Sequence, residues 1–315
     1  DMTMNLHTIL KSVEKPGRYT GGEWGQTIKD KNAVDVRFAF CFPDNYEIGM
    51  SNLGIRILYG VLNNEENVWC ERAYAPWPDM EEKMREYGIP LYAHESGDPL
   101  SDFDIVGFTL QYELCYTNVL NMLELGGIPL LASERGENDP IIIGGGPCAY
   151  NAEPIADFFD VLDIGEGEEM LPRFTRMYAK MKRAGASRAE ILRATSHLDG
   201  FYVPALYEVE YGADGTISSF EPKYDDIPRT VQKQIIADLD SVYFPDKFVM
   251  PYIETVHDRI VPEVYRGCIR GCRFCQAGMI YRPVREKSPD VLDAQCRRLY
   301  KNTGFDEISL CSLSI

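Results

Sequence analysis

Short apolar runs alternate along this chain with longer stretches in which apolar residues recur at every third or fourth position. The short runs are typical of buried β-strands, and the longer stretches are typical of helices that bury one face. We expect strands at 34–42, 68–74, 104–110, 140–143 and 161–164, and helices from Leu53 onward, at 78–87, at 116–125 and at 170–183. Strands that alternate with helices in this way predict an α/β domain with a parallel, doubly wound sheet.

The pattern changes on both sides of this domain. We expect a short helix at 3–14, a glycine-rich arm at 17–33, a β-hairpin made of 201–211 and 216–220, a linker that runs to 255, strands at 260–265 and 307–313, and a helix at 288–302. The predicted domains are therefore an N-terminal helix and arm (1–33), the α/β domain (34–199), a hairpin and linker (200–255), and a β-loop-α-β unit (256–315).

Composition narrows the possible functions. The sequence has 315 residues and a formal net charge of −17, and such an acidic chain is a poor ligand for a phosphate backbone, so nucleic acid is not favoured as a partner. Six basic residues lie around the cysteines near the C-terminal end, and we interpret them mainly as solvated surface with a few contacts to an anionic cofactor; they are Arg266, Arg270, Arg273, Arg282, Arg285 and Lys287. No apolar run is long enough to cross a bilayer, and residues 1–30 hold no signal-peptide core.

Three cysteines near the C-terminal end carry the clearest chemical signal. Cys268, Cys272 and Cys275 form a C-x-x-x-C-x-x-C run, which can supply three thiolates to a four-iron cluster and leave the fourth iron to another ligand. Gly267 and Gly271 lack a Cβ, so the loop can adopt positive φ and pass close to a cluster. Nine cysteines in a chain of this length do not indicate a disulfide scaffold, and with this motif they indicate a reducing compartment, the cytoplasm.

A zinc site is the alternative interpretation of the same cysteines. Its fourth ligand would be Cys296, Cys311 or His257. Structural zinc is usually held by two C-x-x-C pairs, and this chain has one such pair, so an iron–sulfur cluster is favoured.

The cysteine loop, with Phe274 at the aromatic position, resembles the signature of the radical S-adenosylmethionine (radical SAM) superfamily. The resemblance implies a [4Fe-4S] cluster that binds and reductively cleaves S-adenosylmethionine, with Phe274 on the adenine side and Ser309 or Ser312 facing the methionine moiety. It also implies an electron donor such as ferredoxin or flavodoxin. In this superfamily the loop follows the first strand of a partial (β/α)6 barrel. We therefore expect residues 256–315 to be its truncated beginning, inactive alone and poorly ordered or paired with another chain.

The loops at the carboxyl ends of the predicted strands resemble the cobalamin (B12)-binding domain that precedes many radical SAM enzymes. That domain has a flavodoxin-like, Rossmann-like sheet. Matching positions are Asp44 and Gly49 of D-x-H-x-x-G, Thr109 at a serine, the glycine pair Gly145 and Gly146, and Glu166 within G-E-G-E. Tyr46 stands where the family has the histidine that ligates cobalt. The resemblance implies that these residues form one rim for a corrin, whose cobalt has no histidine ligand here.

The sequence thus predicts the N-terminal part of a radical SAM enzyme that transfers a group to, or modifies, an unknown substrate. The α/β domain either carries cobalamin or serves as a substrate-recognition cap. Two other classes stay open: a cobalamin- or nucleotide-binding module with a structural cluster, and a zinc-stabilised interaction protein.

Overall fold

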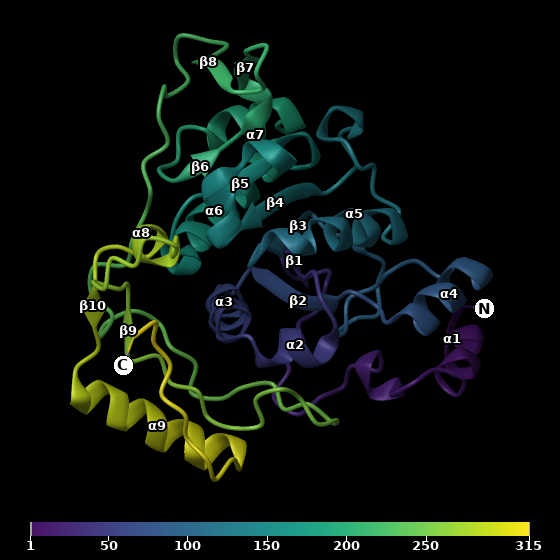
Figure 1. Ribbon diagram of the computed structural model, residues 1–315. Helices are drawn as coiled ribbons and strands as arrows, with labels where there is room; N and C mark the ends of the chain where they lie inside the picture. Colours follow the sequence, from purple (N-terminus) through teal and green to yellow (C-terminus); the bar gives the residue numbers. More distant parts are fainter. Residues whose placement is uncertain (1, 315) are drawn as a thin grey trace.

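The computed structural model describes residues 2–314, with side chains from Leu6 onward, and is organised around one mixed six-stranded sheet (Figure 1). The strand order is β2-β1-β3-β4-β5-β6, and every neighbouring pair is parallel except β5 with β6. The strands are β1 (Val36–Phe42), β2 (Val68–Tyr74), β3 (Ile105–Thr109), β4 (Ile141–Gly145), β5 (Val161–Asp163) and β6 (Phe201–Tyr202). The order of the first five is the flavodoxin-like order, which confirms the predicted fold class.

Helices cover both faces of the sheet. The helices of the α/β domain are α2 (Tyr46–Ser51), α3 (Leu53–Asn63), α4 (Pro78–Tyr87), α5 (Tyr116–Leu125), α6 (Gly167–Arg183) and α7 (Arg188–Thr195). One core joins α4 and α5 to side chains such as Ala39 and Val106, and the other joins α3, α6 and α7 to side chains such as Phe38 and Ile143. Alternate residues of each strand thus face opposite cores, so the strands are buried on both faces.

Local signals explain why several elements end where predicted. Pro78 occupies the first turn of α4, where its missing N–H costs nothing, and Gly88 ends that helix at φ 64°. The bounds of β2, α4 and α5 coincide with the prediction. The helix α2 was not predicted; Asn45 caps it by accepting a hydrogen bond from the Ile48 N–H.

Further differences lie around the hairpin. The helix α7 and the antiparallel edge strand β6 were not predicted, and β6 takes the first residues of the stretch expected to form the hairpin. The hairpin itself is present as β7 (Tyr207–Tyr211) paired with β8 (Ile217–Pro222). An N-terminal helix, α1 (Met2–Leu10), precedes the arm, which meets the linker at an antiparallel bridge between Trp24 and Met250.

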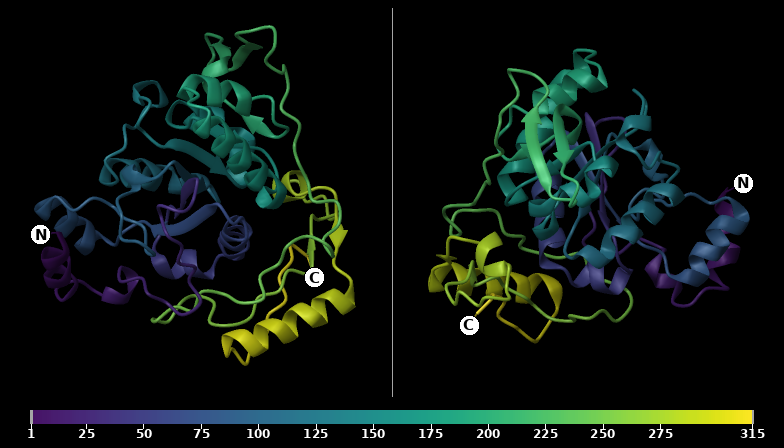
Figure 2. Two further views of the ribbon diagram at one scale, coloured as in Figure 1. Left: turned by 180° about the vertical axis from the view of Figure 1, so that it is seen from behind. Right: turned by 45° about the horizontal axis from the view of Figure 1, so that its top comes forward.

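The C-terminal unit lies on one side of the α/β domain, close to α3 and away from α1 and α4 (Figure 2). It contains β9 (Tyr265–Arg266), α8 (Ala277–Ile280), β10 (Arg285–Glu286) and α9 (Pro289–Thr303), whose N-terminus Ser288 caps. The long strands predicted at 260–265 and 307–313 are reduced to parallel bridges, Ile260 with Ile308 and Glu263 with Cys311, while β9 pairs with β10 instead. A small core that includes Ile57, Phe248 and Leu299 packs α9 and the linker against α3.

Across residues 2–314, no helix combines the length and apolarity needed to cross a membrane.

Candidate functional site

A narrow crevice opens at the carboxyl ends of β3, β4 and β5. It has a volume of about 110 Å³, and its walls include Thr109, Gln111, Gly145 and Asp163. Gly145 leaves room for a carboxylate, because a Cβ at this position would lie 2.2 Å from Oδ1 of Asp163. The carboxyl ends of parallel strands are where such sheets bind ligands, and the crevice lies at this edge.

Asp163 is the unusual titratable group of the crevice. Its side chain is buried, and no ion pair to it is present among the described residues. Burial disfavours the charged form and raises the pKa of Asp163 to about 7, although hydrogen bonding to its own backbone opposes the shift. Near neutral pH a substantial share of this carboxyl is therefore protonated and able to donate a hydrogen bond.

A larger cavity, which we call the rim cavity, lies between the sheet edge and the C-terminal unit. Its volume is about 340 Å³. The sheet side contributes Gly146, Gly165 and Glu166, and the C-terminal unit contributes Arg266, Gly267, Tyr281 and Ser312. The N-terminal half of α3 forms a further wall through Leu53, Ile57 and Leu58. Cys268 follows Gly267 directly, so the cavity adjoins the start of the cysteine loop.

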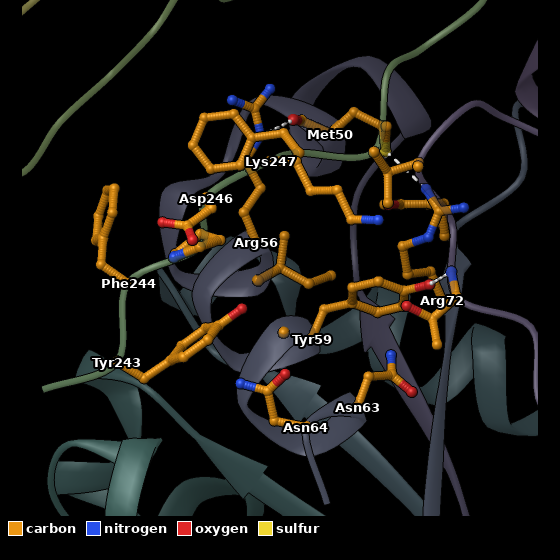
Figure 3. Close-up of a pocket in the computed structure, with 18 residues that line it drawn as sticks. Met50, Arg56, Tyr59, Asn63, Asn64, Arg72, Tyr243, Phe244, Asp246 and Lys247 are labelled. Carbon is orange, nitrogen blue, oxygen red and sulfur yellow. Dashed lines mark hydrogen bonds between the residues drawn. The ribbon is translucent and has the colours of Figure 1, made fainter. Parts of the chain in front are cut away.

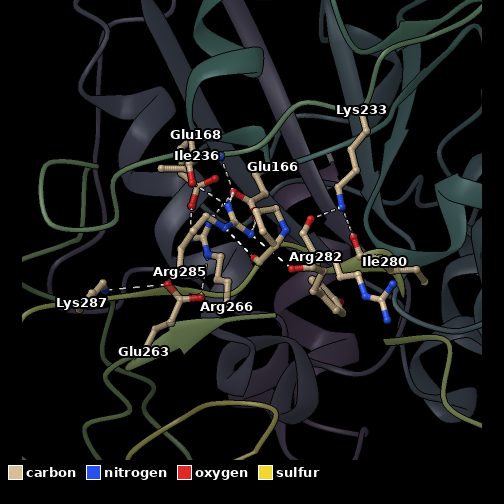
Figure 4. A network of polar contacts seen from close by, with 12 residues as sticks. Glu166, Glu168, Lys233, Ile236, Glu263, Arg266, Ile280, Arg282, Arg285 and Lys287 are labelled. Carbon is tan, nitrogen blue, oxygen red and sulfur yellow. Dashed lines mark hydrogen bonds and ion pairs between the residues drawn. The ribbon is translucent and has the colours of Figure 1, made fainter. Parts of the chain in front are cut away.

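A network of buried ion pairs joins the two sides of the rim cavity (Figure 4). Arg285 donates to both carboxylate oxygens of Glu166, at 2.6 and 2.7 Å. Arg266 contacts Glu166 at 3.1 Å and Glu263 at 2.8 Å, and it also pairs with Glu168. Lys287 lies 3.8 Å from Glu263. The expectation that these basic residues are mainly solvated is wrong for Arg266, Arg285 and Lys287, because each is buried against a carboxylate.

The electrostatic balance of this network favours the charged forms. Burial raises the pKa of Glu166, but the hydrogen bonds from Arg285 and the charge of Arg266 outweigh it, so the net pKa lies below the usual range. Burial lowers the pKa of Arg266, and the carboxylates of Glu168 and Glu263 more than offset that effect. The network therefore holds β9, and with it the base of the cysteine loop, against the G-E-G-E turn.

The cysteine loop itself is open to solvent. Cys272 and Cys275 are exposed, Cys268 is partly exposed, and a turn brings the Cys275 N–H to 3.1 Å from the Cys272 carbonyl. Gly267 adopts φ 91°, and a Cβ there would lie 2.8 Å from the carbonyl oxygens of Tyr281 and Pro283. This close approach fixes where the loop leaves β9.

The three cysteine thiols of this loop are suitable ligands for iron, although their sulfur atoms do not lie close together in the described structure. Within residues 2–314, no group of three or more His, Cys, Asp or Glu side chains lies close enough together to hold a metal. A ligand site is rarely preformed without its metal, and three thiols on an exposed loop retain the freedom to converge. The other candidate thiols are less suitable, because burial raises the pKa values of Cys296 and Cys311 and so disfavours their thiolates. The three-cysteine ligand set stays a prediction.

The residues expected to face S-adenosylmethionine are spread over the unit. Phe274 is 91% exposed, so its ring forms no wall in the described structure. Ser309 accepts a hydrogen bond from Arg259 at 3.2 Å and does not line the rim cavity. Ser312 does line it, and its hydroxyl is buried with no hydrogen-bond partner among the described residues. Of these three side chains, Ser312 is the one placed to meet a ligand of the cavity.

The rim predicted for a corrin is divided into two parts. Thr109, Gly145 and Gly146 line the crevice, and Glu166 lines the adjoining rim cavity. Tyr46 is buried elsewhere: it is 1% exposed, donates to Glu23 at 2.8 Å and stacks on His94. Asp44 accepts a hydrogen bond from Tyr112, and Gly49 packs against Tyr74. The Tyr46 phenol is thus committed to the core and does not fit as a ligand of cobalt.

Comparison with known proteins agrees with the cysteine motif. Residues 54–204, which run from α3 to the residues just before the hairpin, match the model of a family described as radical SAM proteins, N-terminal. These residues are therefore similar to the N-terminal region of radical SAM proteins. This confirms the family resemblance inferred from the sequence, and the matched residues include Thr109, Gly145 and Asp163 of the crevice and also Glu166.

Two longer proteins are similar to most of the chain. An uncharacterized protein of Methanocaldococcus jannaschii is 25% identical over 283 residues, a match that covers 88% of this chain and 49% of the relative. The structure of TsrM, a radical S-adenosylmethionine methyltransferase from Kitasatospora setae with tryptophan and a SAM analogue bound, aligns with a TM-score of 0.47 and 11% identity. That alignment covers 87% of this chain and 47% of TsrM. The chain spans about half the length of each.

The ion-pair network is the part of the radical SAM candidate site that sequence reasoning missed. Glu166 and Arg285 are separated by 119 positions, and the sequence shows no pattern that pairs them. The available signal was the coincidence of a carboxylate-rich G-E-G-E turn with a cluster of basic residues around the cysteines. Opposite charges in two predicted loops, each next to a candidate site, are good candidates for contact.

Proposed function

We propose that this chain is the N-terminal part of a radical SAM enzyme in which Cys268, Cys272 and Cys275 hold a [4Fe-4S] cluster. One observation supports this most: the cysteine motif begins at the wall of a 340 Å³ cavity whose other wall is the ligand-binding edge of the sheet. Cys268, Cys272 and Cys275 would hold such a cluster with one iron free of protein ligands, and when bound it would supply the electron for reductive cleavage of S-adenosylmethionine in the modification of, or group transfer to, a substrate.

The residues of the chain have positioning roles in this proposal. Arg266 holds the base of the cysteine loop against Glu166 and Glu168, and Arg285 reinforces the same contact. Tyr150 and Tyr281 line the rim cavity with mostly apolar surface, which excludes water from a reactive species. The hydroxyl of Ser312 offers a hydrogen bond to a bound molecule. The α/β domain acts as a substrate-recognition cap, and no step through cobalamin is proposed, because Tyr46 is not available to cobalt.

The test is anaerobic reconstitution of the purified protein with iron and sulfide. We expect charge-transfer absorption that is lost in Cys268→Ala, Cys272→Ala and Cys275→Ala and retained in the matched control Cys296→Ala. The electron paramagnetic resonance spectrum of the reduced cluster should change when S-adenosylmethionine is added, because one iron is open to it.

Other outcomes identify the rival functions. A cluster whose spectrum does not change when S-adenosylmethionine is added indicates a structural role. Stoichiometric zinc in place of iron indicates a zinc-stabilised interaction protein. Retained absorption in Cys272→Ala contradicts the ligand assignment. Turnover is not the readout, since residues 1–315 alone are expected to be inactive.

A further inference from the structure

A second cavity, separate from the rim cavity, lies between the linker and a different face of α3 from the one that lines the rim cavity. We call it the crossing cavity, and we call residues 243–250, which form its outer wall, the crossing segment. Its volume is about 340 Å³, which is large enough for a small ligand rather than a single water. Figure 3 shows Arg56 and Tyr59 of α3, and Asn64 directly after it, together with Tyr243, Asp246 and Lys247 of the crossing segment.

Arg56 is the unusual side chain of the crossing cavity. Its Nε donates to the Met50 carbonyl at 2.8 Å, and its guanidinium carbon lies 4.6 Å from the centre of the Phe248 ring. Its Nη1 is buried and has no hydrogen-bond partner among the described residues, where no carboxylate forms an ion pair with it either. Burial lowers its pKa to about 10, with Tyr74 and Asp258 opposing the shift. Arg56 as a whole is partly buried, and its Nη1, which is out of water without an acceptor, carries a desolvation cost that a bound anion would offset.

The remaining lining adds positive charge and hydrogen-bond donors. Lys247 reaches the same cavity and pairs with no carboxylate within residues 2–314. The cavity's carboxylate, Asp246, is already paired with Arg298, and Arg72 is already paired with Glu23 and Glu95. Burial raises the pKa of Tyr243 to about 12, so its hydroxyl stays protonated at neutral pH. Arg56 and Lys247 are therefore the two cationic side chains of the lining that form no ion pair with a carboxylate of the described residues.

We propose that the crossing cavity binds the phosphate group of a small phosphorylated molecule through Arg56 and Lys247. A phosphate carries close to two negative charges at neutral pH and so matches the two free cations, whereas a carboxylate matches one. The planar guanidinium of Arg56 can donate two parallel hydrogen bonds to phosphate oxygens, and the ammonium of Lys247 acts as a point charge. The site depends on neither the cysteine loop nor the rim cavity, so it goes beyond the proposed function.

Contacts at both ends of the crossing segment hold it over the cavity. Tyr243 lies over Gly60, where a Cβ would come within 2.3 Å of the phenol oxygen. The adjoining bridge between Trp24 and Met250 ties the end of the crossing segment to the N-terminal arm. The wall that carries Lys247 is thus fixed at both ends against the α/β domain.

The test uses the protein without iron, so that it is independent of cluster chemistry. Inorganic phosphate and pyrophosphate are titrated by calorimetry, with sodium chloride at matched ionic strength as the reference, and the melting temperature is followed in the same solutions. We expect both phosphates to bind and to raise the melting temperature, because a ligand that binds only the folded state stabilises it. Lys247→Ala and Arg56→Gln should each weaken binding at least tenfold.

Controls separate this result from general charge effects. Lys180→Ala removes an exposed lysine of α6 and should leave binding unchanged. Lys247 is also exposed, so its replacement leaves the fold intact, which far-ultraviolet circular dichroism checks. Equal stabilisation by chloride, unchanged affinity in Lys247→Ala, or no binding of either phosphate at millimolar concentration would overturn the proposal. Preference for citrate over phosphate would overturn its assignment to a phosphate group.

Discussion

Two faces of helix α3 line two cavities of similar volume, and the arginines at these cavities differ in whether they have carboxylate partners. In the rim cavity, Arg266 and Arg285 are matched by Glu166, Glu168 and Glu263. In the crossing cavity, Arg56 has no carboxylate partner within the described residues. A matched network is complete without a ligand and holds parts of the protein together, whereas a partly buried cation without a carboxylate partner loses hydration that a bound anion would replace. The comparison therefore separates arginines that stabilise the fold, such as Arg266 and Arg285, from Arg56, which is available to bind a ligand.

The largest effect should come from breaking the matched network. Glu166→Gln removes the carboxylate that pairs with Arg285 and contacts Arg266, and it leaves both cations buried. We expect the free energy of unfolding to fall by about 3–5 kcal/mol, the usual cost of removing one partner of a buried ion pair. Urea denaturation measures it.

The matched control for this substitution is Glu221→Gln. Glu221 pairs with Arg229 on the exposed hairpin, where both side chains are at least half exposed, so a change of less than about 1 kcal/mol is expected. Equal losses in the two variants would show that the rim network is no stronger than a surface pair.

Asp163 gives a second test of an unpaired charge, because it lines the crevice next to the rim cavity and forms no ion pair among the described residues. Its folded-state pKa of about 7 lies above the ordinary value of 3.8. Because the carboxyl pKa is raised on folding, Asp163 destabilises the folded protein. This destabilisation is absent below the unfolded-state pKa, grows as the pH rises between the two pKa values, and is constant above about pH 7. Asp163→Asn should therefore raise the free energy of unfolding at pH 8 by at most about 4 kcal/mol and change it little at pH 4.

Urea denaturation of Asp163→Asn and the parent protein at both pH values checks this sign. The expected gain appears at pH 8 and disappears at pH 4. A loss of stability at pH 8 would mean that the Asp163 carboxylate has a favourable partner and that the crevice is electrostatically complete.

The sequence predicted the sheet and its helices well, because those elements follow from local patterns. The bounds of β2, α4 and α5 were predicted to the residue by apolar periodicity and by signals such as Pro78 and Gly88. The short helix α2 was missed because one capping side chain, Asn45, decides it. The strands expected beside the cysteine loop form only bridges, although their residues are strongly apolar.

The two cavities could not be predicted in the same way. Each depends on contacts between segments far apart in the sequence, such as Arg285 with Glu166 and Phe248 with Arg56. Thr109 and Gly145 of the predicted rim line the crevice, but Tyr46 lies elsewhere, because its burial with Glu23 and His94 depends on the N-terminal arm. Motif spacing identifies which loops carry chemistry, and tertiary packing decides which side chains reach it.

The smallest expected effect gives the most direct comparison, since one substitution is made in both cavities. Arg285→Met should destabilise the protein, because it leaves the Glu166 carboxylate with one cationic partner fewer in a buried position. Arg56→Met should instead stabilise the ligand-free protein by about 1 kcal/mol, since replacing an unmatched buried charge by an apolar side chain is often favourable. The gain stays small because the substitution also removes the hydrogen bond to Met50 and the contact with Phe248.

Thermal denaturation in phosphate-free buffer and in phosphate decides the matter. In phosphate-free buffer, Arg56→Met should melt at a higher temperature than the parent protein. In phosphate this order should reverse, because phosphate stabilises the parent protein and does not stabilise Arg56→Met. If Arg56→Met is destabilised in phosphate-free buffer as strongly as Arg285→Met, then Arg56 is a structural residue whose contacts with Met50 and Phe248 outweigh its burial. The difference between the cavities on the two faces of α3 would then be one of geometry rather than of function.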